Sequence, residues 1–282
     1  MKLTFLIHCS DTSGIIHEVT AFLSNLDGNI VYLDQHVDKA AAVFFMRLEC
    51  EFDTIQNLDR LTELFQASVA NKYRMIWSVH PAAEIPRMGI FVSKYKHCLY
   101  DLLGRHQSGE LRVDIPFILS NHPDLESIAK QFGIPFYHVP VDKNNKSQAE
   151  SRQLEILKEH SVDFIVLARY MQIVSERLID AYPNKIINIH HSFLPAFAGA
   201  KPYHAAFERG VKIIGATSHY VTEDLDEGPI IAQDVTPVSH IHSVTDFITK
   251  GRDLEKIVLS RAVQLHLQRK TMVYNNKTVI FS

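Results

Sequence analysis

The sequence has few cysteines, no long apolar run and no excess of either charge. Its three cysteines, Cys9, Cys50 and Cys98, are far apart and form no CxxC pair. This excludes a disulfide framework and leaves small buried hydrophobes as their expected role. Lys and Arg total 29 against 32 Asp and Glu, a formal charge of -3, so nothing indicates a nucleic-acid or membrane partner and a small-molecule substrate is expected. Because no apolar run approaches the ~20 residues of a membrane span, and the opening run is too short for a signal peptide, we expect a cytoplasmic protein.

The length of 282 residues is sufficient for two domains, and the first 83 residues have the pattern of a small one. Strands are expected at 3–9, 29–37, 41–50 and 74–80. Helices are expected at 15–26 and 55–69, where apolar residues recur at helical spacing. The resulting βαββαβ order is the split βαβ arrangement of a ferredoxin-like fold. The segment 80–86, with two prolines and small residues, is the expected linker.

From residue 84 to residue 282, strands alternate with helices, which predicts a Rossmann-like α/β domain with a mostly parallel sheet. A strand at 229–238 has no helix before it and is expected to be antiparallel, and a long helix at 244–267 is expected to end the domain. Open α/β sheets bind ligands at the carboxyl ends of their strands. That rule brings together the ends of the segments 163–171 and 186–192 and the loop after 213–221.

The segment 186–192, IINIHHS, is a buried strand that ends in polar side chains. Asn188 and His190 share one face of this strand by its period of two, so both can reach one small group. An amide and an imidazolium together can polarise a carbonyl and stabilise the oxyanion that forms when the carbonyl is attacked. A carboxylate from the loop after residue 219 can orient His190 or hold a water. The candidates in this loop are Glu223, Asp224, Asp226 and Glu227.

Plainer interpretations compete with the catalytic one. A histidine at a strand end is usually a hydrogen-bonded structural residue, and an acidic loop is usually solvated. His190, His191 and Asp226 are also of metal-ligand types, but no HxxxH or HExxH spacing supports a metal site. Ser192 lacks the GxSxG context of a serine nucleophile. The expected site therefore contains no metal.

Two motifs, in order along the chain, resemble the formyltransferase fold family, which includes glycinamide ribonucleotide and methionyl-tRNA formyltransferases. They are NIHHSFLP at 188–195 and SHYVTEDLDEGPII at 218–231, and their signature positions are Asn188, His190, Ser192, Leu194, Pro195, His219, Val221 and Asp226. The resemblance implies Asn188, His190 and Asp226 as the catalytic set. It also implies a folate pocket that includes the segment LARYMQIVS. The implied substrate-binding residues are Met171, Gln172, Ile173, His191, Thr222, Glu223, Asp224 and Leu225.

Three departures from the transferases make the chain similar to the formyltetrahydrofolate deformylases. Transferases acting on glycinamide ribonucleotide have a glycine-rich phosphate cradle after the first strand, whereas this chain has no glycine between Val92 and Gly104. His191 stands where transferases usually have proline, and a further domain precedes the catalytic one. The resemblance implies hydrolysis of 10-formyltetrahydrofolate to formate and tetrahydrofolate, with no prosthetic group. Such a reaction supplies formate for purine synthesis and balances the one-carbon folate pool.

The sequence allows more than one role for some residues and more than one function for the chain. His191 is either a donor that helps to exclude an amine acceptor or a packing residue at the strand end. Lys94 and His97 lie where a phosphate cradle would be and can close an acceptor pocket. The alternative functions are a formyltransferase with an unidentified amine acceptor and a non-catalytic sensor of folate or an amino acid.

The segment 11–30, DTSGIIHEVTAFLSNLDGNI, resembles the opening of an ACT domain, with Ser13 where the pattern usually has proline. ACT domains usually bind an amino acid at a dimer interface. The resemblance therefore implies an ACT regulatory domain at 1–83, a catalytic domain at 84–282 and a homo-oligomer, with glycine or methionine as a reasonable effector. The implied effector-binding residues are Asp11, Gly14, Ile15, Asn29 and Ile30. Alternatively, Gly14 only begins a helix and Gly28 only ends it.

Overall fold

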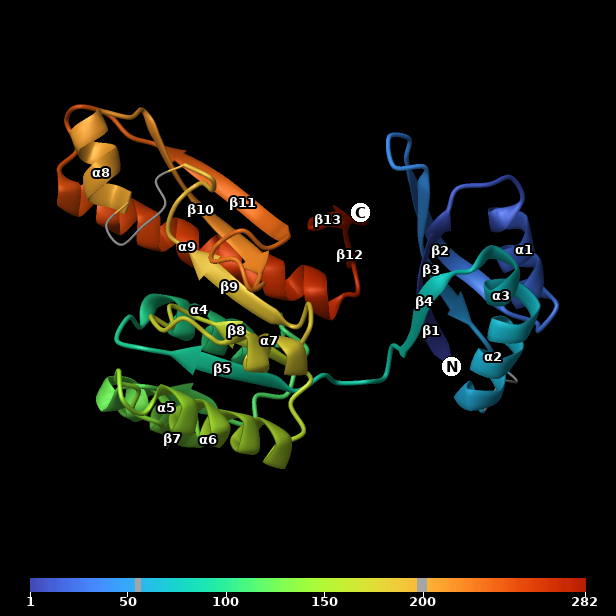
Figure 1. Ribbon diagram of the computed structural model, residues 1–282, viewed down its shortest axis with the longest axis horizontal. Coiled ribbons are helices and arrows are strands. Elements are labelled where there is room, and N and C mark those ends of the chain that lie inside the picture. The colour runs from blue at the N-terminus through green and yellow to red at the C-terminus, as the bar shows by residue number, and fades with distance from the viewer. Residues whose placement is uncertain (54–56, 197–201) are drawn as a thin grey trace. The chain divides into compact units, whose positions relative to one another are not determined.

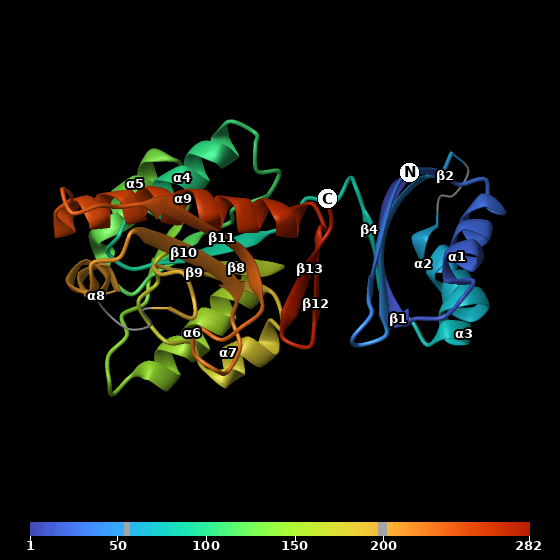
Figure 2. The same ribbon diagram turned by 90° about the horizontal axis from the view of Figure 1, so that it is seen from above.

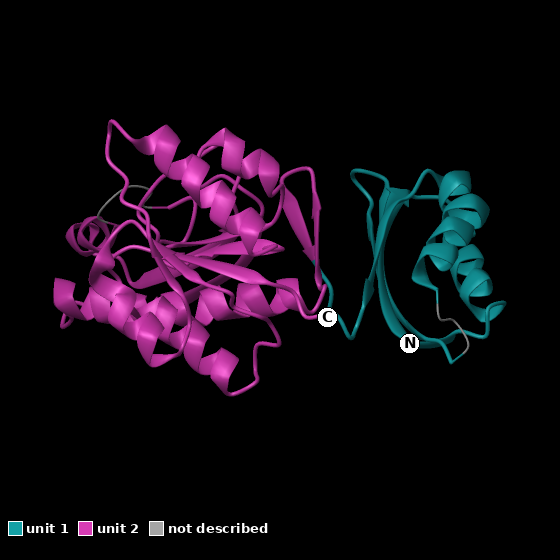
Figure 3. Cartoon of the chain, turned by 90° about the horizontal axis from the view of Figure 1, so that it is seen from below, with its two compact units in different colours: residues 1–84, 280–282 teal, residues 85–279 magenta. Residues whose placement is uncertain are grey.

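The computed structural model describes residues 1–53, 57–196 and 202–282 of the chain. These residues form two compact units (Figure 3). The smaller unit contains Met1–Glu84 together with Ile280–Ser282, and the larger contains Ile85–Val279.

The smaller unit has the predicted βαββαβ order. It begins with strand β1 (Lys2–Ser10), helix α1 (Ile15–Ser24), strand β2 (Asn29–Asp38) and strand β3 (Val43–Glu51), and continues with helix α2 (Leu58–Phe65), the π-helical turn η1 (Gln66–Ala70), helix α3 (Asn71–Tyr73) and strand β4 (Ile76–Pro81). In the described residues its strands form an antiparallel sheet in the order β2-β3-β1-β4, and the helices cover one face of this sheet (Figure 2). The helix predicted at 55–69 is thus three consecutive helical elements, and its first two residues lie outside the described residues.

Alternation along the strands explains the core of this unit. Leu3, Phe5 and Ile7 of β1 point to the helical face and pack with Val19 and Leu23 of α1. Gly28, after α1, is required by this packing, since a Cβ there would lie 2.6 Å from the ring of Phe52 and 2.7 Å from the sulfur of Cys50. The close approach explains why a glycine precedes β2.

The larger unit alternates strands and helices along most of its length (Figure 1). Its first half comprises β5 (Met88–Val92), α4 (His97–Gln107), β6 (Ile118–Ser120), the 3-10 turn η2 (Pro123–Leu125), α5 (Glu126–Gln131), β7 (Phe136–His138) and α6 (Lys146–Glu159). Its second half comprises β8 (Phe164–Leu167), α7 (Glu176–Ala181), β9 (Ile186–His190), α8 (Pro202–Arg209), β10 (Ile213–Tyr220), β11 (Ile230–Pro237) and α9 (Val244–Leu267). This is the predicted α/β class.

In the described part of this unit, seven strands form one sheet in the order β11-β10-β9-β8-β5-β6-β7. The pairs from β9 to β7 are parallel, whereas β10 is antiparallel to both β9 and β11. The carboxyl-end rule assumes parallel strands and does not apply to the segment 213–221, although the loop after this segment does join the other two segments as predicted. Tyr220, at the carboxyl end of β10, pairs with Ile187 near the start of β9 and not with its end. The following loop must turn back to reach His190.

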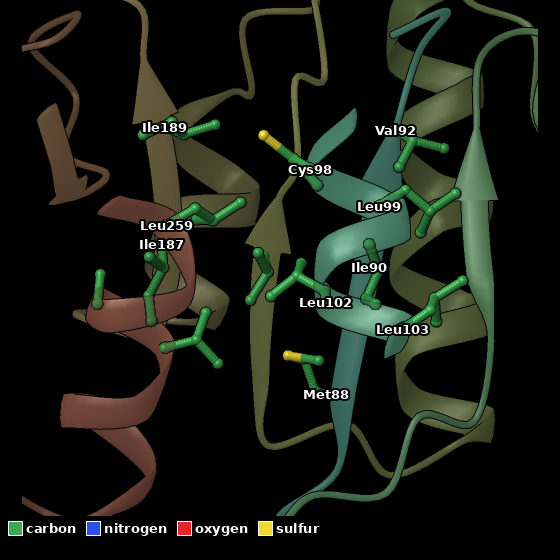
Figure 4. Packing of buried hydrophobic residues seen from close by; sticks show 14 of the residues in the cluster. Met88, Ile90, Val92, Cys98, Leu99, Leu102, Leu103, Ile187, Ile189 and Leu259 are labelled. Atoms are coloured by element: carbon green, nitrogen blue, oxygen red, sulfur yellow. The ribbon is translucent and has the colours of Figure 1, made fainter. Parts of the chain in front are cut away.

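Residues of β5 point alternately to two helical layers. Met88, Ile90 and Val92 pack against α4, on the face that also receives α5 and α9 (Figure 4). Phe91 faces the opposite layer, which contains α6 and α7. A strand buried on both faces needs apolar side chains at every position, and MGIFV meets that need.

The chain does not end the unit with α9 as predicted. Strands β12 (Thr271–Tyr274) and β13 (Lys277–Ile280) form a hairpin after it, around the residues Asn275 and Asn276. Both asparagines have positive φ, of 45° and 56°, as a tight hairpin turn requires. In the described parts of the chain, none of the helices combines the length and the hydropathy needed to cross a membrane.

Candidate active site

A cavity of about 460 Å³ lies at the carboxyl ends of β8 and β9. Three segments line it: 167–174 after β8, 188–191 at the end of β9, and 219–226 after β10. Every predicted catalytic and substrate-binding residue lies on its wall, namely Asn188, His190, Asp226, Met171, Gln172, Ile173, His191, Thr222, Glu223, Asp224 and Leu225. The structure therefore brings together residues that are up to 55 positions apart in the chain.

His190, which is buried, and Asp226, which is partly exposed, form a pair in this cavity. Nδ1 of His190 lies 3.1 Å from Oδ2 of Asp226, and the His190 side chain is only 8% exposed. Because Nδ1 donates its hydrogen to the carboxylate, the tautomer leaves Nε2 available, and Nε2 has no hydrogen-bond partner among the described residues. The hydrogen bond from His190 holds the pKa of Asp226 well below its ordinary value, although burial alone would raise it. The pair therefore presents an oriented imidazole that can exchange a proton with a bound ligand.

Asn188 is oriented through His219. Nδ1 of His219 lies 2.8 Å from the carbonyl oxygen of Tyr220, to which it donates. Nε2 of the same ring then accepts from Nδ2 of Asn188 at 3.2 Å and lies 3.6 Å from Oδ1 of Asp226. One N–H of the Asn188 amide is thus used, and the second is left to donate to a ligand oxygen.

The loop after β10 carries Asp226 back to His190 by means of unusual backbone geometry. Asp226 has a φ of 59°, in the left-handed region that Asp tolerates better than most residues. Gly228 closes the loop where a Cβ would lie 1.8 Å from the carbonyl oxygen of Tyr220. The nitrogen of Tyr220 in turn donates to the oxygen of Pro229 at 2.9 Å. Only glycine fits at position 228, which explains the Gly-Pro that follows the acidic run.

The segment after β8 is fixed at both ends by polar contacts. The nitrogen of Met171 donates to Oγ of Ser93 at 2.9 Å. The nitrogen of Ser175 donates to Glu150 at 2.9 Å, and Oγ of Ser175 donates to the same carboxylate. Between these anchors Met171 and Ile173 remain 50% and 60% exposed. Apolar side chains held at a cavity mouth suit the faces of a planar ligand.

Three further residues named from the sequence, His191, Lys94 and His97, lie in different surroundings. His191 is 9% exposed, and its ring lies 5.1 Å from that of His190 and 5.9 Å from that of Tyr203, between centroids. Lys94 is exposed. His97, at the start of α4, contacts the buried Glu255 of α9 at 2.8 Å.

Sequence reasoning did not select two polar residues of the cavity wall, His219 and Arg169. His219 stood in the signature, but its contact with Asn188 depends on the antiparallel register of β9 and β10, in which the two residues are directly opposite. Arg169 follows a buried strand in an otherwise apolar context, and nothing in the sequence shows that its partner is Glu255, 86 positions later.

One group of three metal-ligand types occurs in the described residues: His97, Cys98 and Glu255 offer atoms within 4.8 Å of one another. The guanidinium of Arg169 lies 3.4 Å from the same Glu255 carboxylate. A cation so close opposes a second positive charge at this place, so the geometry does not favour a metal ion.

Within one chain the predicted effector residues lie in two places. Asp11, Gly14 and Ile15 follow β1, whose end pairs with Val43, whereas Asn29 and Ile30 begin β2 opposite Glu51 and Cys50. These ends of β3 are separated by eight residues, or roughly 26 Å of strand. Gly14 has a φ of 92° and directly precedes α1, so it has a backbone role in addition to any role in binding.

Comparison with known proteins defines the class of protein first. Residues 86–263 match the family described as formyl transferase, and residues 4–66 match the ACT domain family. The chain also resembles the solved structure of glycinamide ribonucleotide transformylase 1 from Symbiobacterium toebii, with a TM-score of 0.66 and 30% identity over 70% of this chain and 95% of that one.

Two further relatives share both units. The chain is 51% identical to a formyltetrahydrofolate deformylase of Synechocystis sp., over 100% of this chain and 99% of the relative. A crystal structure of a formyltetrahydrofolate deformylase from Pseudomonas syringae matches it with a TM-score of 0.97 at 45% identity, over 100% of this chain and 95% of that one. The chain belongs to the formyltetrahydrofolate deformylase family of ACT-containing formyl transferase-fold proteins.

Proposed function

We propose that the protein hydrolyses 10-formyltetrahydrofolate to formate and tetrahydrofolate. The observation that carries this proposal is the His190–Asp226 pair beside Asn188 in one cavity, in a chain whose full-length relatives are named formyltetrahydrofolate deformylases. The cavity, at about 460 Å³, is within the range of small-molecule sites. The substrate enters and leaves as a ligand, and no prosthetic group takes part.

The proposed reaction uses the three side chains in different ways. The free N–H of Asn188 and the protonated Nε2 of His190 donate to the formyl oxygen and stabilise the oxyanion as water adds to the formyl carbon. Asp226 holds the imidazole by its Nδ1–H and helps to position the water. The C–N10 bond then breaks, one proton of the water goes to N10, and the other is released as formate forms.

The remainder of the cavity wall fits the folate. Met171, Ile173 and Leu225, which are at least half exposed, cover the faces of the pterin. The backbone of residues 222–226 supplies hydrogen bonds to its edge, together with the side chains of Gln172, Glu223 and Asp224. His191 contributes through its packing on His190 and Tyr203. If replacement of His191 by proline leaves hydrolysis unchanged, His191 has no catalytic role.

Transfer of the formyl group to an amine is the competing function. The fate of the formyl group distinguishes the two. Purified protein is supplied with formyl-labelled 10-formyltetrahydrofolate and a panel of small amines, and formate and formylated amines are both quantified. Hydrolysis predicts formate as the only labelled product, in the same yield with and without the amines. A formylated amine formed in preference to formate would refute the hydrolase assignment.

A regulatory role for the smaller unit rests on its ACT fold. We assign residues 1–83 to an ACT regulatory domain that binds an amino acid and residues 84–282 to the catalytic domain. Because Gly14 and Asn29 stand at opposite ends of the sheet, a ligand that contacts both needs two copies of the chain, so the proposal includes a homo-oligomer. Calorimetry with glycine and methionine tests this. Binding of neither would remove both as effectors.

This activity gives the protein a place in cytoplasmic one-carbon metabolism. Hydrolysis returns tetrahydrofolate to the folate pool and supplies formate for purine synthesis. Without regulation the reaction would deplete formylated folate, so control by the ACT domain is metabolically useful.

A further inference from the structure

Arg169 is a buried cation in the wall of the catalytic cavity. It follows β8 with a φ of 63° and is only 8% exposed. Leu167 pairs with Asn188 in the parallel register of β8 and β9, and Arg169 and His190 each follow that pair by two residues. The two side chains therefore arise at the same edge of the sheet, on neighbouring strands, and both line the cavity.

A network around Glu255 holds Arg169 in place. The carboxylate of Glu255, 1% exposed, accepts from the hydroxyl of Tyr203 at 2.6 Å and contacts Nε2 of His97 at 2.8 Å. Burial alone would raise the pKa of Glu255, but the hydrogen bond from His97 and the charge of Arg169 bring it below its ordinary value. Glu255 is thus a carboxylate at neutral pH and favours the positive charge of Arg169.

The network does not use all the donors of Arg169. Its Nε lies 3.4 Å from Glu255, the longest of the three contacts to that carboxylate, and makes no hydrogen bond among the described residues. The guanidinium carbon lies 5.0 Å from the centre of the Tyr95 ring, a cation–π contact that does not occupy an N–H. A guanidinium has five N–H donors in a planar fork that matches a carboxylate. The unused donors, on a residue of the cavity wall that also includes His190, thus define a place for a small planar anion.

We propose that Arg169 binds the carboxylate of formate, the anionic product, in a subsite next to His190. This inference rests on the proposed function, because hydrolysis is the reaction that converts a neutral formyl group into a carboxylate in this cavity. Glu255, Tyr203 and His97 act as positioning residues that fix the guanidinium. As the carbon–nitrogen bond breaks, the nascent carboxylate gains a charge-assisted partner that the neutral formyl group does not have.

Binding of labelled formate to the full-length protein, without folate, tests the proposal. Formate is titrated by NMR against wild type, Arg169→Gln and Arg252→Gln, and formamide serves as the neutral ligand of similar shape. Arg252 is a matched control, because its guanidinium lies 5.7 Å from the same Tyr95 ring and the residue is not part of the cavity wall. We expect Arg169→Gln to weaken formate binding by more than about fivefold, Arg252→Gln to leave it unchanged, and formamide to bind wild type more weakly than formate.

Three results would contradict the assignment of a formate subsite to Arg169. A smaller loss in Arg169→Gln, no binding of formate to wild type, or equal binding of formamide and formate would each overturn the proposal. If Arg169→Gln does not fold because Glu255 is left without its countercharge, the double variant Arg169→Gln/Glu255→Gln removes both charges and must show the same loss. Hydrolysis is measured in parallel. If wild type binds formate through Arg169 but releases none from 10-formyltetrahydrofolate, the proposed hydrolysis is refuted and the formate subsite is not.

Discussion

Asp226 is the residue that connects the rest of the site. Its two carboxylate oxygens face two imidazoles, His190 at 3.1 Å and His219 at 3.6 Å, and His219 also contacts Asn188. A single anion thus lies beside the imidazole that we propose as the proton-transfer group and beside the imidazole that contacts Asn188. Such arrangements act by positioning as much as by charge.

We expect Asn188 to make its main contribution in the transition state. Replacement by alanine removes one donor to the developing oxyanion and should lower kcat by about two to three orders of magnitude, with a smaller change in KM. Steady-state hydrolysis kinetics measure this. Asn144→Ala, at an exposed position far along the chain, should retain wild-type rates. A loss of less than about threefold in Asn188→Ala would show that Asn188 is not an oxyanion donor.

Asp226 should also make stability depend on pH. Its pKa is lowered in the folded state, so its ionised form stabilises the protein above its unfolded pKa of about 4, and this contribution is lost as the pH falls toward the folded pKa. Urea unfolding between pH 7 and pH 3 measures the effect in wild type and Asp226→Asn. The free energy difference between them should shrink as the pH falls below about 4. A constant difference would contradict the assignment, and exposed Asp180→Asn should follow wild type.

At the scale of elements, the loop between β10 and β11 is the part on which the site depends. It must reverse direction because β10 is antiparallel to β9, and it does so through the left-handed Asp226 and the sterically restricted Gly228. The backbone of this loop, more than any side chain in it, places the carboxylate beside His190.

Gly228→Ala should therefore displace the loop. The added Cβ would lie 1.8 Å from the oxygen of Tyr220, so we expect a lower melting temperature and a large loss of kcat. Gly104→Ala is the matched control, because nothing lies within 4 Å of a Cβ at that helical position. It should raise the free energy of unfolding by about 0.5–1 kcal/mol with full activity. Thermal unfolding and formate release measure both variants. Wild-type behaviour of Gly228→Ala would contradict this account of the loop.

The sequence predicts elements better than it predicts how they pair. Periodicity located α9 at residues 244–267 and the βαββαβ order, because burial imposes a pattern on the residues themselves. The direction of β10 is set by contacts with β9, which leave no periodic trace. The hairpin after α9 was missed although TMVYNNKTVI carries an Asn-Asn turn between β-branched residues.

Prediction of the site is limited in the same way, because the sequence indicates the residues better than it indicates their contacts. Alternation put Asn188 and His190 on one face, and the resemblance selected Asp226 among four carboxylates; all three line the cavity. The contacts of Asn188 with His219 and of Arg169 with Glu255 join different elements and depend on the tertiary structure. The burial of the three cysteines, at 5% exposure or less, confirms the prediction that they are small core residues.

At the scale of the whole molecule, the described cavity belongs entirely to the larger unit. All of its lining residues lie between Leu167 and Asp226, within Ile85–Val279. A shortened chain that begins at Ile85 should therefore release formate from 10-formyltetrahydrofolate within about tenfold of the full chain, since no residue of the oxyanion site is removed. Circular dichroism establishes that it is folded. A folded fragment without activity would show that the smaller unit contributes to the reaction.

The most direct measurement is formate release by the purified full-length protein from 10-formyltetrahydrofolate, without an amine acceptor, beside Asp226→Asn. We predict steady release by wild type and by the exposed control Asp180→Asn, and a loss of at least about two orders of magnitude in Asp226→Asn, which keeps the shape of the side chain but removes its charge. Steady release by Asp226→Asn at the wild-type rate, or none by wild type, would contradict this prediction.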